Sequence, residues 1–291
     1  MAVTVFDDRK REHTFFAAPK RIISLVPSDT YNVAALGAGA ALIGRTDYCE
    51  LPADLVKDIP ALGGTKNPRV DDIIALQPDL VLANQEENTR GDLEKLITAG
   101  LRVYLCFPKR VEDGLAHLAK LAKILHATTK PEVRALFKDG YAALQAAPSS
   151  PPLRIFCPIW MDPLMTIHES TFISDMIRAA GGVNVFADRE RRYPLAADLG
   201  RRVALTGETV IGLDVRYPRI TLDEVVERKP DVILLPNEPH PFTEADAEVF
   251  RALDTPAKSR IVFTDGKDLC WYGARSVEGL PRLRALFDTL R

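Results

Sequence analysis

The sequence lacks the features that mark several large classes of protein. No apolar run approaches the roughly 18 residues that a membrane-spanning helix needs. The net charge of −2 is far from the basic excess typical of nucleic-acid binding, so no nucleic-acid partner is expected. Four cysteines are present without a CxxC pair, which argues for buried free thiols rather than a structural zinc site. There is also no GxSxG elbow, P-loop or HExxH motif, so no familiar catalytic signature appears and no catalytic residue is assigned.

The N-terminal stretch MAVTVFDDRKREHTFF does not have the pattern of a secretory leader. It carries charges where a leader would have its apolar core. Two explanations stay open at this point. Either the chain acts in the cytoplasm, or a leader was removed or was never included in this sequence.

One stretch occurs twice in related form. VDDIIALQPDLVLAN (70–84) and LDEVVERKPDVILLPN (222–237) each run from an acidic helix start through Pro-Asp into an apolar run that ends in Asn. The residue before a proline is disfavoured in a helix, which ends the helical part. A continuous apolar run is typical of a buried parallel strand. The duplication therefore predicts two lobes built on a similar plan.

Strands and helices alternate on both sides of the central region. In the first half we expect strands at 21–26, 42–44, 79–84 and 102–107, and helices at 30–40, 70–77 and 88–100. In the second half we expect strands at 153–157, 231–237 and 260–265, and helices at 170–182, 222–230, 243–253 and 279–290. Ser28 and Asp29, which follow Pro27, are expected to cap the first helix. The alternation predicts an α/β fold with two Rossmann-like lobes and parallel sheets.

The predicted division of the chain has three parts. Residues 20–110 form an N-terminal α/β lobe, 111–150 form connecting helices that include a rigid backbone helix, and 151–291 form a C-terminal α/β lobe. The second connecting helix begins near Pro131, which suits a first helical turn. A helix of about 17 residues would span roughly 25 Å, so limited hinge motion is expected. Ligands of open α/β sheets bind beyond the carboxyl ends of the strands, which predicts a cleft there.

Four stretches together resemble a known family. They are RIISLVPSDTYNVAALGAGAALIGRTDYC (21–49), GGTKNPRVDDIIALQPDLVLA (63–83), LPNEPHPF (235–242) and TDGKDLCWYGARSVEGLPRLRALF (264–287). The pattern resembles the helical-backbone (class III) periplasmic substrate-binding proteins of ABC importers. That family captures cobalamin, haem and ferric siderophores. The segment Asp188–Pro218 departs from the compact cobalamin-binding members, which have only a short connection there.

The resemblance implies a receptor and not an enzyme. Its ligand would be a small cobalt or iron chelate, with a cobalamin-like corrinoid favoured over haem or a ferric siderophore, and no resident cofactor is implied. The partner would be an ABC permease in the membrane, and the receptor a monomer in the periplasm or at the cell surface. Two alternatives stay open: a cytoplasmic chelate carrier or sensor, and a chelatase-like enzyme in which His168 and Glu169 imitate the catalytic pair.

Aromatic residues make up only 7% of the chain, so their positions are informative. A flat macrocycle needs broad aromatic walls with few polar contacts. The predicted ligand-binding residues lie at strand carboxyl ends or in neighbouring loops, and they are Trp160, Trp271, Tyr272, Arg275, Tyr31, Tyr48, Tyr193 and His240. Ordinary packing is the alternative for each aromatic residue. Arginines bind carboxylates and phosphates in bidentate fashion, and further candidates are Arg191, Arg192, Arg216 and Arg219.

Histidine is too scarce for a bare-ion receptor with three imidazole ligands. Five are present; His13 is placed before the fold, and His117 and His126 in the connecting region. No metal site in the protein is therefore predicted. Glu87 and Glu244 follow the duplicated strands, and the resemblance implies that one acidic residue per lobe docks on the permease. The alternative for both is a solvated acidic start of a helix, favoured by the helix dipole.

Overall fold

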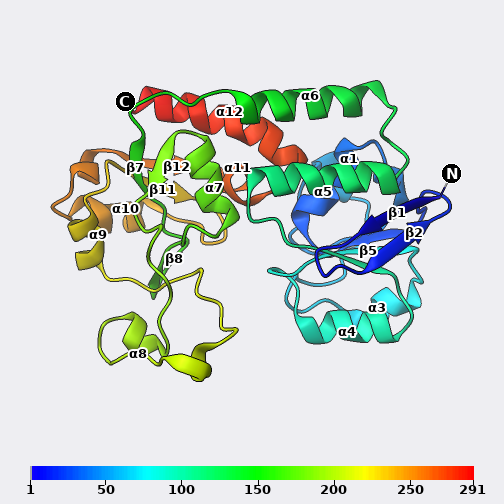
Figure 1. Cartoon of the computed structure of the whole chain (residues 1–291), viewed down its shortest axis with the longest axis horizontal. Coiled ribbons are helices and arrows are strands. Elements are labelled where there is room, and N and C mark those ends of the chain that lie inside the picture. Colours follow the sequence, from blue (N-terminus) through cyan, green and yellow to red (C-terminus); the bar gives the residue numbers. More distant parts are fainter. Residues whose placement is uncertain (1) are drawn as a thin grey trace. The chain divides into compact units, whose positions relative to one another are not determined.

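The computed structural model describes residues 2–291, and the chain separates into two compact units (Figure 1). The first unit contains the chain up to Pro108, Glu112–Ala142 and Trp271–Val277, and the second contains Lys109–Val111, Ala143–Cys270 and Glu278–Arg291. This division differs from the predicted one at several boundaries. Most of the connecting helical region belongs to the first unit, and so does Trp271–Val277. Within residues 2–291, no helix is both long and apolar enough to cross a membrane.

A four-stranded parallel sheet lies at the centre of the first unit. Its strands are β3 (Ile22–Ser24), β4 (Leu42–Gly44), β5 (Leu80–Asn84) and β6 (Val103–Cys106), in the order β4-β3-β5-β6. The helices that precede or follow them are α1 (Pro27–Ala35), α2 (Ala53–Val56), α3 (Val70–Ala75), α4 (Arg90–Thr98), α5 (Val111–Ile124) and α6 (Pro131–Gln145), with the short turn η1 (Gly39–Ala41). The order and direction of the strands confirm the predicted first lobe.

Helices cover both faces of this sheet. On one face, Ile73 of α3 and Leu96 of α4 pack with Ile23, Val81 and Leu105 of the strands. Helices α1 and α5 lie on the other side of the sheet (Figure 1). β5 is buried along its whole length, which explains why its sequence is apolar at successive positions instead of alternating.

Two expectations for the first lobe are wrong. Helix α1 begins at Pro27, and its N-cap, Val26, makes no side-chain hydrogen bond, so Ser28 and Asp29 lie inside the first turn and do not cap it. Proline has no N–H and is pre-shaped for a first helical position, so the helix starts two residues earlier than a Ser28 cap would set. The fold also begins before residue 20. An antiparallel hairpin of β1 (Val3–Phe6) and β2 (Glu12–Phe15) places His13 within the folded unit.

The second unit repeats the arrangement of the first. Its parallel strands are β7 (Leu153–Phe156), β10 (Gly182–Asn184), β11 (Val232–Pro236) and β12 (Ile261–Thr264), in the order β10-β7-β11-β12. A small antiparallel hairpin is made by β8 (Trp160–Met161) and β9 (Leu164–Met165). The remaining elements are α7 (Phe172–Ala179), α8 (Leu195–Asp198), η2 (Gly207–Val210), α9 (Leu222–Arg228), α10 (Glu244–Arg251), η3 (Pro256–Ser259), α11 (Lys267–Cys270) and α12 (Ala274–Thr289).

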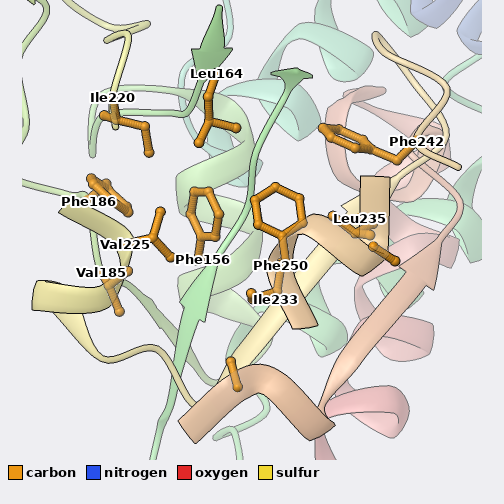
Figure 2. Packing of buried hydrophobic residues seen from close by; sticks show 12 residues of the cluster. Phe156, Leu164, Val185, Phe186, Ile220, Val225, Ile233, Leu235, Phe242 and Phe250 are labelled. Carbon is orange, nitrogen blue, oxygen red and sulfur yellow. The ribbon is translucent and has the colours of Figure 1, made fainter. Parts of the chain in front are cut away.

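An aromatic cluster forms part of the core of the second unit (Figure 2). The ring of Phe156 lies 5.3 Å from that of Phe186 and 5.7 Å from that of Phe250, the latter edge-to-face. All three side chains are fully buried. Burial of one such ring contributes about 1.5–3 kcal/mol. Because Phe156 is the last residue of β7, this packing fixes the point from which the β8–β9 hairpin leaves the sheet.

The duplicated sequence occupies equivalent places in the two sheets. β5 and β11 are each third in strand order and buried at all five positions. The Asn at the end of each apolar run holds a loop beyond the strand ends. Asn84 Oδ1 accepts a hydrogen bond from Glu86 N at 2.7 Å, and Asn237 Oδ1 accepts one from Gly266 N at 2.8 Å. The prediction of two similar α/β lobes is confirmed.

Candidate functional site

An aromatic surface lies beyond the carboxyl ends of β7 and β11 in the second unit. Trp160 on β8 is 43% exposed, and its Nε1 donates to Asp162 O at 3.1 Å. Its ring centroid lies 5.3 Å from that of His240, which in turn meets Phe242 edge-to-face at 4.6 Å. Trp160 stands opposite Met165 in the hairpin. The loops that follow two neighbouring strands therefore meet around one indole, and contact of Trp160 and His240 with a ligand stays a prediction.

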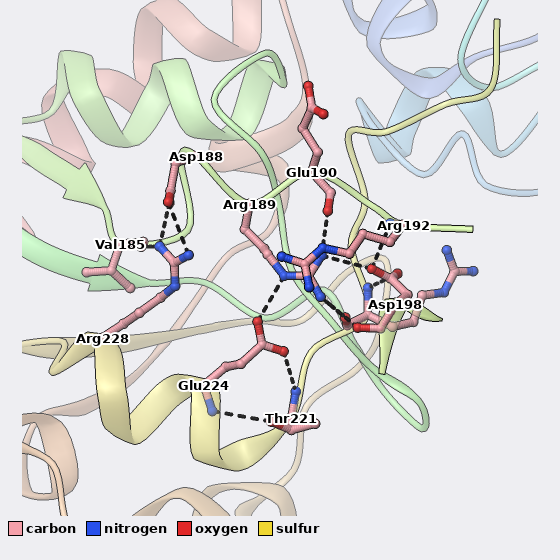
Figure 3. A network of polar contacts seen from close by, with 10 residues as sticks. Val185, Asp188, Arg189, Glu190, Arg192, Asp198, Thr221, Glu224 and Arg228 are labelled. Carbon is pink, nitrogen blue, oxygen red and sulfur yellow. Dashed lines mark hydrogen bonds and ion pairs between the residues drawn. The ribbon is translucent and has the colours of Figure 1, made fainter. Parts of the chain in front are cut away.

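The segment Asp188–Pro218 is anchored by a buried ion network (Figure 3). Arg189, only 4% exposed, donates through Nη1 to Asp198 Oδ1 and through Nε to Glu224 Oε2, each at 2.9 Å. The second carboxylate oxygen of Asp198 accepts from Arg219 N at 2.7 Å. A buried arginine needs paired carboxylates to offset its lost hydration. The network thus fixes both ends of the insertion on the body of the unit.

Beyond this anchor the insertion presents a mixed apolar and basic surface. Its exposed apolar residues are Leu195, Val203, Leu205, Ile211 and Leu213. The Arg191 guanidinium lies 4.4 Å above the Tyr193 ring, whose hydroxyl donates to Asp214 O at 2.7 Å. Arg216 is paired with Asp214 at 2.6 Å. Tyr193 and two of the candidate arginines therefore lie together, although Arg216 already has a carboxylate partner.

The aromatic residues of the first unit differ in exposure. Tyr48 is 61% exposed, whereas Trp271 and Tyr272 are buried, at 5% and 4%. Tyr31 meets Trp271 edge-to-face at 6.1 Å, and both Tyr31 and Arg275 are half-buried. Trp271 and Tyr272 thus offer little surface here, and their contact with a ligand stays a prediction.

A buried polar cluster in the first unit was not predicted. Asp29 Oδ1 lies 2.7 Å from His117 Nε2, and Asp29 Oδ2 accepts from Tyr272 Oη at 3.3 Å and from Cys106 Sγ at 3.7 Å. Cys106 Sγ and Tyr272 Oη are 3.1 Å apart. All four residues are at most 4% exposed. They come from α1, the end of β6, α5 and the segment before α12, and no spacing in the sequence indicates that these four meet.

Burial controls the protonation of the thiols and phenols near strand ends. Burial, together with the Asp29 carboxylate, raises the pKa of Cys106 well above its usual value. Burial likewise raises the pKa of Tyr272, again with Asp29 contributing. For Cys157, directly after β7, burial alone raises the pKa to about 12. All four cysteines are free, as expected, and all but the half-buried Cys270 are buried.

The two predicted docking residues lie in loops or helix starts after the duplicated strands. Glu87 is half-buried, and its N–H donates to Asn84 Oδ1 at 3.4 Å. Glu244 is the first residue of α10 and pairs with Arg251 at 2.5 Å, with most of its side chain exposed. The structure thus places both after their strands, and their role stays a prediction.

A hollow of about 760 Å³ lies elsewhere in the first unit. It is lined by residues 11–20, 78–79, 97 and 100–103, near the amino ends of β5 and β6. None of the predicted ligand-binding residues lines it. Because ligands of open α/β sheets bind at the carboxyl ends, this hollow is set apart from the candidate site.

Comparison with known proteins decides the family. A family model described as "Periplasmic binding protein" matches residues 22–252. The chain belongs to this family. A vitamin B12-binding protein of Photorhabdus laumondii is 26% identical over 225 residues, covering 77% of this chain and 73% of that protein. A vitamin B12-binding protein of Yersinia pestis is 27% identical over 220 residues, covering 75% and 70%.

Solved structures of periplasmic binding proteins share the fold. The haem-binding protein RhuT of Roseiflexus sp. RS-1 gives a TM-score of 0.72 at 22% identity, covering 94% of this chain and 99% of its own. The vitamin B12-binding protein BtuF of Vibrio cholerae gives 0.70 at 21% identity, covering 94% and 98%. Members of this family are substrate-binding receptors that work with ABC transporters, so the expectation of a receptor rather than an enzyme is confirmed.

Proposed function

We propose that this protein is the substrate-binding component of an ABC importer and that it captures a flat metal chelate. A cobalamin-like corrinoid is favoured over haem or a ferric siderophore as the ligand. The observation that carries the proposal is the exposed indole of Trp160, held beside His240 beyond the carboxyl ends of β7 and β11. A planar macrocycle buries large apolar area against such a ring while leaving its polar edge to other groups. The relatives named for vitamin B12 binding favour the corrinoid.

The insertion supplies groups that suit the edge of such a ligand. Several of its exposed side chains are apolar, as the Trp160 ring is, and Arg191 and Arg192 add positive charge. Corrinoid phosphate, haem propionates and siderophore carboxylates are all anionic groups that guanidinium binds well. The Arg191 guanidinium is held over the Tyr193 ring, which lowers the entropy lost when it pairs with an anion. The ligand contacts proposed in the first unit are Tyr31, Tyr48, Trp271, Tyr272 and Arg275.

Tryptophan fluorescence tests the ligand and the site together, because the chain has two tryptophans of very different exposure. The purified protein is titrated with cyanocobalamin, hemin and ferric siderophores, with inner-filter correction. We expect saturable one-to-one quenching by cyanocobalamin that persists in Trp271→Phe and is lost in Trp160→Phe. No saturable response to any ligand, from protein with an unchanged circular dichroism spectrum, would overturn the proposal.

The partner is proposed to be an ABC permease that contacts Glu87 and Glu244. Exposed charges guide encounter and register more than they add affinity. Glu244→Lys should reduce stimulation of the permease ATPase in vesicles while leaving chelate affinity unchanged. Glu248→Lys is the matched control, because Glu248 lies on the same helix, is similarly exposed and also pairs with Arg251. Equal stimulation by the wild type and Glu244→Lys would show that the docking assignment is wrong.

The place of action is proposed to be the periplasm or the cell surface. Fractionation of cells that express the native gene, with antibody detection, tests this directly. Recovery with the released periplasmic or surface fraction is expected. Recovery with the cytoplasmic fraction alone would favour the other candidate, a chelate carrier or sensor that never meets a permease.

A further inference from the structure

The buried cluster around Asp29 has the chemistry of a metal centre. It brings together a carboxylate, a thiol and an imidazole, which are the usual ligand types of zinc, and a phenol oxygen beside them. One donor atom each from Asp29, Cys106 and His117 lies within 4.8 Å of the others. The hydrogen bonds to Asp29 join positions 77, 88 and 243 residues apart in sequence, so the grouping is made by tertiary structure and not by a local turn.

The spacing of the donors fits a tetrahedral ion. Zinc bonds of about 2.0 Å to nitrogen or oxygen and about 2.3 Å to sulfur place neighbouring ligands about 3.3–3.6 Å apart. Here the separations are 2.7 Å for His117 Nε2 to Asp29 Oδ1 and 3.7 Å for Cys106 Sγ to Asp29 Oδ2. Tyr272 Oη lies 3.1 Å from the sulfur and 3.3 Å from the carboxylate. The contacts of Cys106 Sγ and Tyr272 Oη lie within about 0.4 Å of these spacings, and His117 Nε2 would move about 0.6 Å away from Asp29 Oδ1 to reach them.

Neighbouring amides hold two of these donors in place. Asn32 Nδ2 donates to Asp29 Oδ1 at 3.1 Å, while Asn32 Oδ1 accepts from Ala274 N at 2.8 Å. Asn84 Nδ2 donates to Cys106 Sγ at 3.6 Å. Hydrogen bonds from such outer groups orient metal ligands and tune their basicity. The duplicated Asn at the end of β5 would thereby act on the thiol as well as on its loop.

The imidazole of His117 is held at one nitrogen only. Across residues 2–291 its buried Nδ1 finds no hydrogen-bond partner, and neither does the hydroxyl of Tyr104, whose ring stacks on His117 at 5.9 Å. A buried polar atom left unsatisfied costs about 1–3 kcal/mol. The imidazole is therefore positioned by its Nε2 contact with Asp29 alone, so Nε2 is the nitrogen that would face an ion.

We propose that Asp29, Cys106 and His117, with Tyr272 as the fourth ligand, form a closed structural site for a divalent cation of the zinc type. This differs from the sequence-based expectation of no metal site, which rested on the number of histidines and missed a mixed ligand set. The ion would displace the protons shared among these side chains. The site lies within the first unit, and Tyr272 is the one residue that it shares with the proposed chelate contacts, so Asp29, Cys106 and His117 test it independently of chelate capture.

Because the donors are buried, the test offers the metal while the chain folds. The full chain is unfolded in urea with a chelator and a thiol reductant. It is then refolded in the presence or absence of Zn²⁺, and no corrinoid, haem or siderophore is added. Bound zinc is measured by mass spectrometry of the metal after dialysis. We expect one zinc per chain and a higher thermal midpoint for the zinc-refolded protein, since a ligand of the folded state stabilises it.

Four variants separate ligation from folding. Cys106→Ser should weaken zinc binding more than about 100-fold, beyond the roughly 10–100-fold expected for the outer-group change Asn84→Ala. Tyr272→Phe keeps the ring and should weaken binding without unfolding the chain. Cys157→Ser, at a buried thiol outside the cluster, should bind like the wild type.

Cobalt gives a spectroscopic check on the same proteins. Refolding with Co²⁺ should produce a thiolate-to-cobalt charge-transfer band in the wild type and in Cys157→Ser, and none in Cys106→Ser. Folded wild-type protein without bound zinc or this band would overturn the site and leave a hydrogen-bonded network. Equal loss of metal in Cys106→Ser and Cys157→Ser would also overturn it. Chelate binding is measured separately, so failure of one proposal does not imply failure of the other.

Discussion

The two units share a strand order but differ at the carboxyl ends of their strands. In the first unit, Cys106 ends β6 inside a closed polar cluster with Asp29, His117 and Tyr272. In the second unit, Cys157 follows β7 in surroundings where burial alone raises its pKa to about 12. The exposed groups there are aromatic instead, with Trp160 at the surface. A duplicated backbone plan therefore does not fix the chemistry that its strand ends present.

The insertion makes a second difference between the units. The first unit connects β4 to β5 through short helices, whereas the second unit carries Asp188–Pro218 between β10 and α9, anchored by the buried Arg189. The anchor keeps its exposed apolar residues in a fixed arrangement near the hairpin that carries Trp160. Met165 of that hairpin forms a bridge with Arg219, directly after the insertion. The second unit thus carries the additional surface to which the proposed ligand contact is assigned.

The largest effect is expected at the anchor of the insertion. Arg189→Met removes the partner of the buried Asp198 carboxylate, and breaking one side of a buried pair costs about 3–5 kcal/mol. Urea unfolding followed by circular dichroism should show this loss. Arg201→Met, at an exposed arginine of the same insertion, should change stability by no more than about 0.5 kcal/mol. Equal stability of the two variants would mean that the network does not hold the insertion.

A smaller effect is expected at the polar cluster of the first unit. Tyr272→Phe removes a hydroxyl that contacts Cys106 and Asp29, and the loss of buried hydrogen bonds to these groups costs about 1–3 kcal/mol. Tyr48→Phe, at an exposed ring, is the control and should be close to neutral. Chemical denaturation of zinc-free protein measures both. If Tyr272→Phe were also neutral, the cluster would add nothing to the stability of the first unit.

The duplicated helices allow a comparison of capping. Helix α9 has a full capping box between Thr221 and Glu224, whereas the N-cap of α3, Arg69, makes no side-chain cap hydrogen bond. Thr221→Ala should lower stability by about 1 kcal/mol. No cap is lost in Arg69→Ala. Any change there comes from its exposed pair with Asp72 and its hydrogen bond to Ala61 O, and it should be within about 1 kcal/mol. Thermal unfolding measures the midpoint of both variants. A lower midpoint for Arg69→Ala than for Thr221→Ala would contradict this prediction.

The smallest effect concerns thiol reactivity in the native state. The thiolate is the reactive form, and the raised pKa of Cys157, about 12, keeps it protonated. The contribution of its burial to stability is complete below the ordinary pKa of 9.0 and is lost as pH rises through about 12. Alkylation with iodoacetamide at pH 8 should reach half-buried Cys270 first and Cys157 only after unfolding. Peptide mass spectrometry gives the order, and early labelling of Cys157 would contradict it.

Much of the fold is predictable because apolar runs and prolines mark it strongly. The runs at 79–84 and 231–237 predict two buried strands, and Pro131 predicts the start of α6. The weak signals fail for physical reasons. The β1–β2 and β8–β9 hairpins have strands of two to four residues, too short for a clear alternation. The start of α1 is set by Pro27 and not by the polar residues that follow it.

The candidate site is less predictable because it depends on tertiary contacts. Trp160 was found from its position after a strand, which is a local property. The burial of Tyr272 is not a local property, because its hydroxyl contacts Cys106 and Asp29 from distant parts of the chain. His117 was assigned to a connecting region, yet its helix packs on the sheet and brings the ring to Asp29. A sequence shows which residues follow a strand, but not which of them turn inward.

The central claim is that this periplasmic binding protein captures a corrinoid through the exposed indole of the second unit. Isothermal titration of the full chain with cyanocobalamin, beside Trp160→Ala, tests it most directly. The account predicts one site per chain and an affinity lowered about tenfold or more in the variant, as for loss of an aromatic worth about 1.4 kcal/mol or more. Binding of cyanocobalamin with unchanged affinity in Trp160→Ala, or no heat of binding in folded wild-type protein, would contradict it.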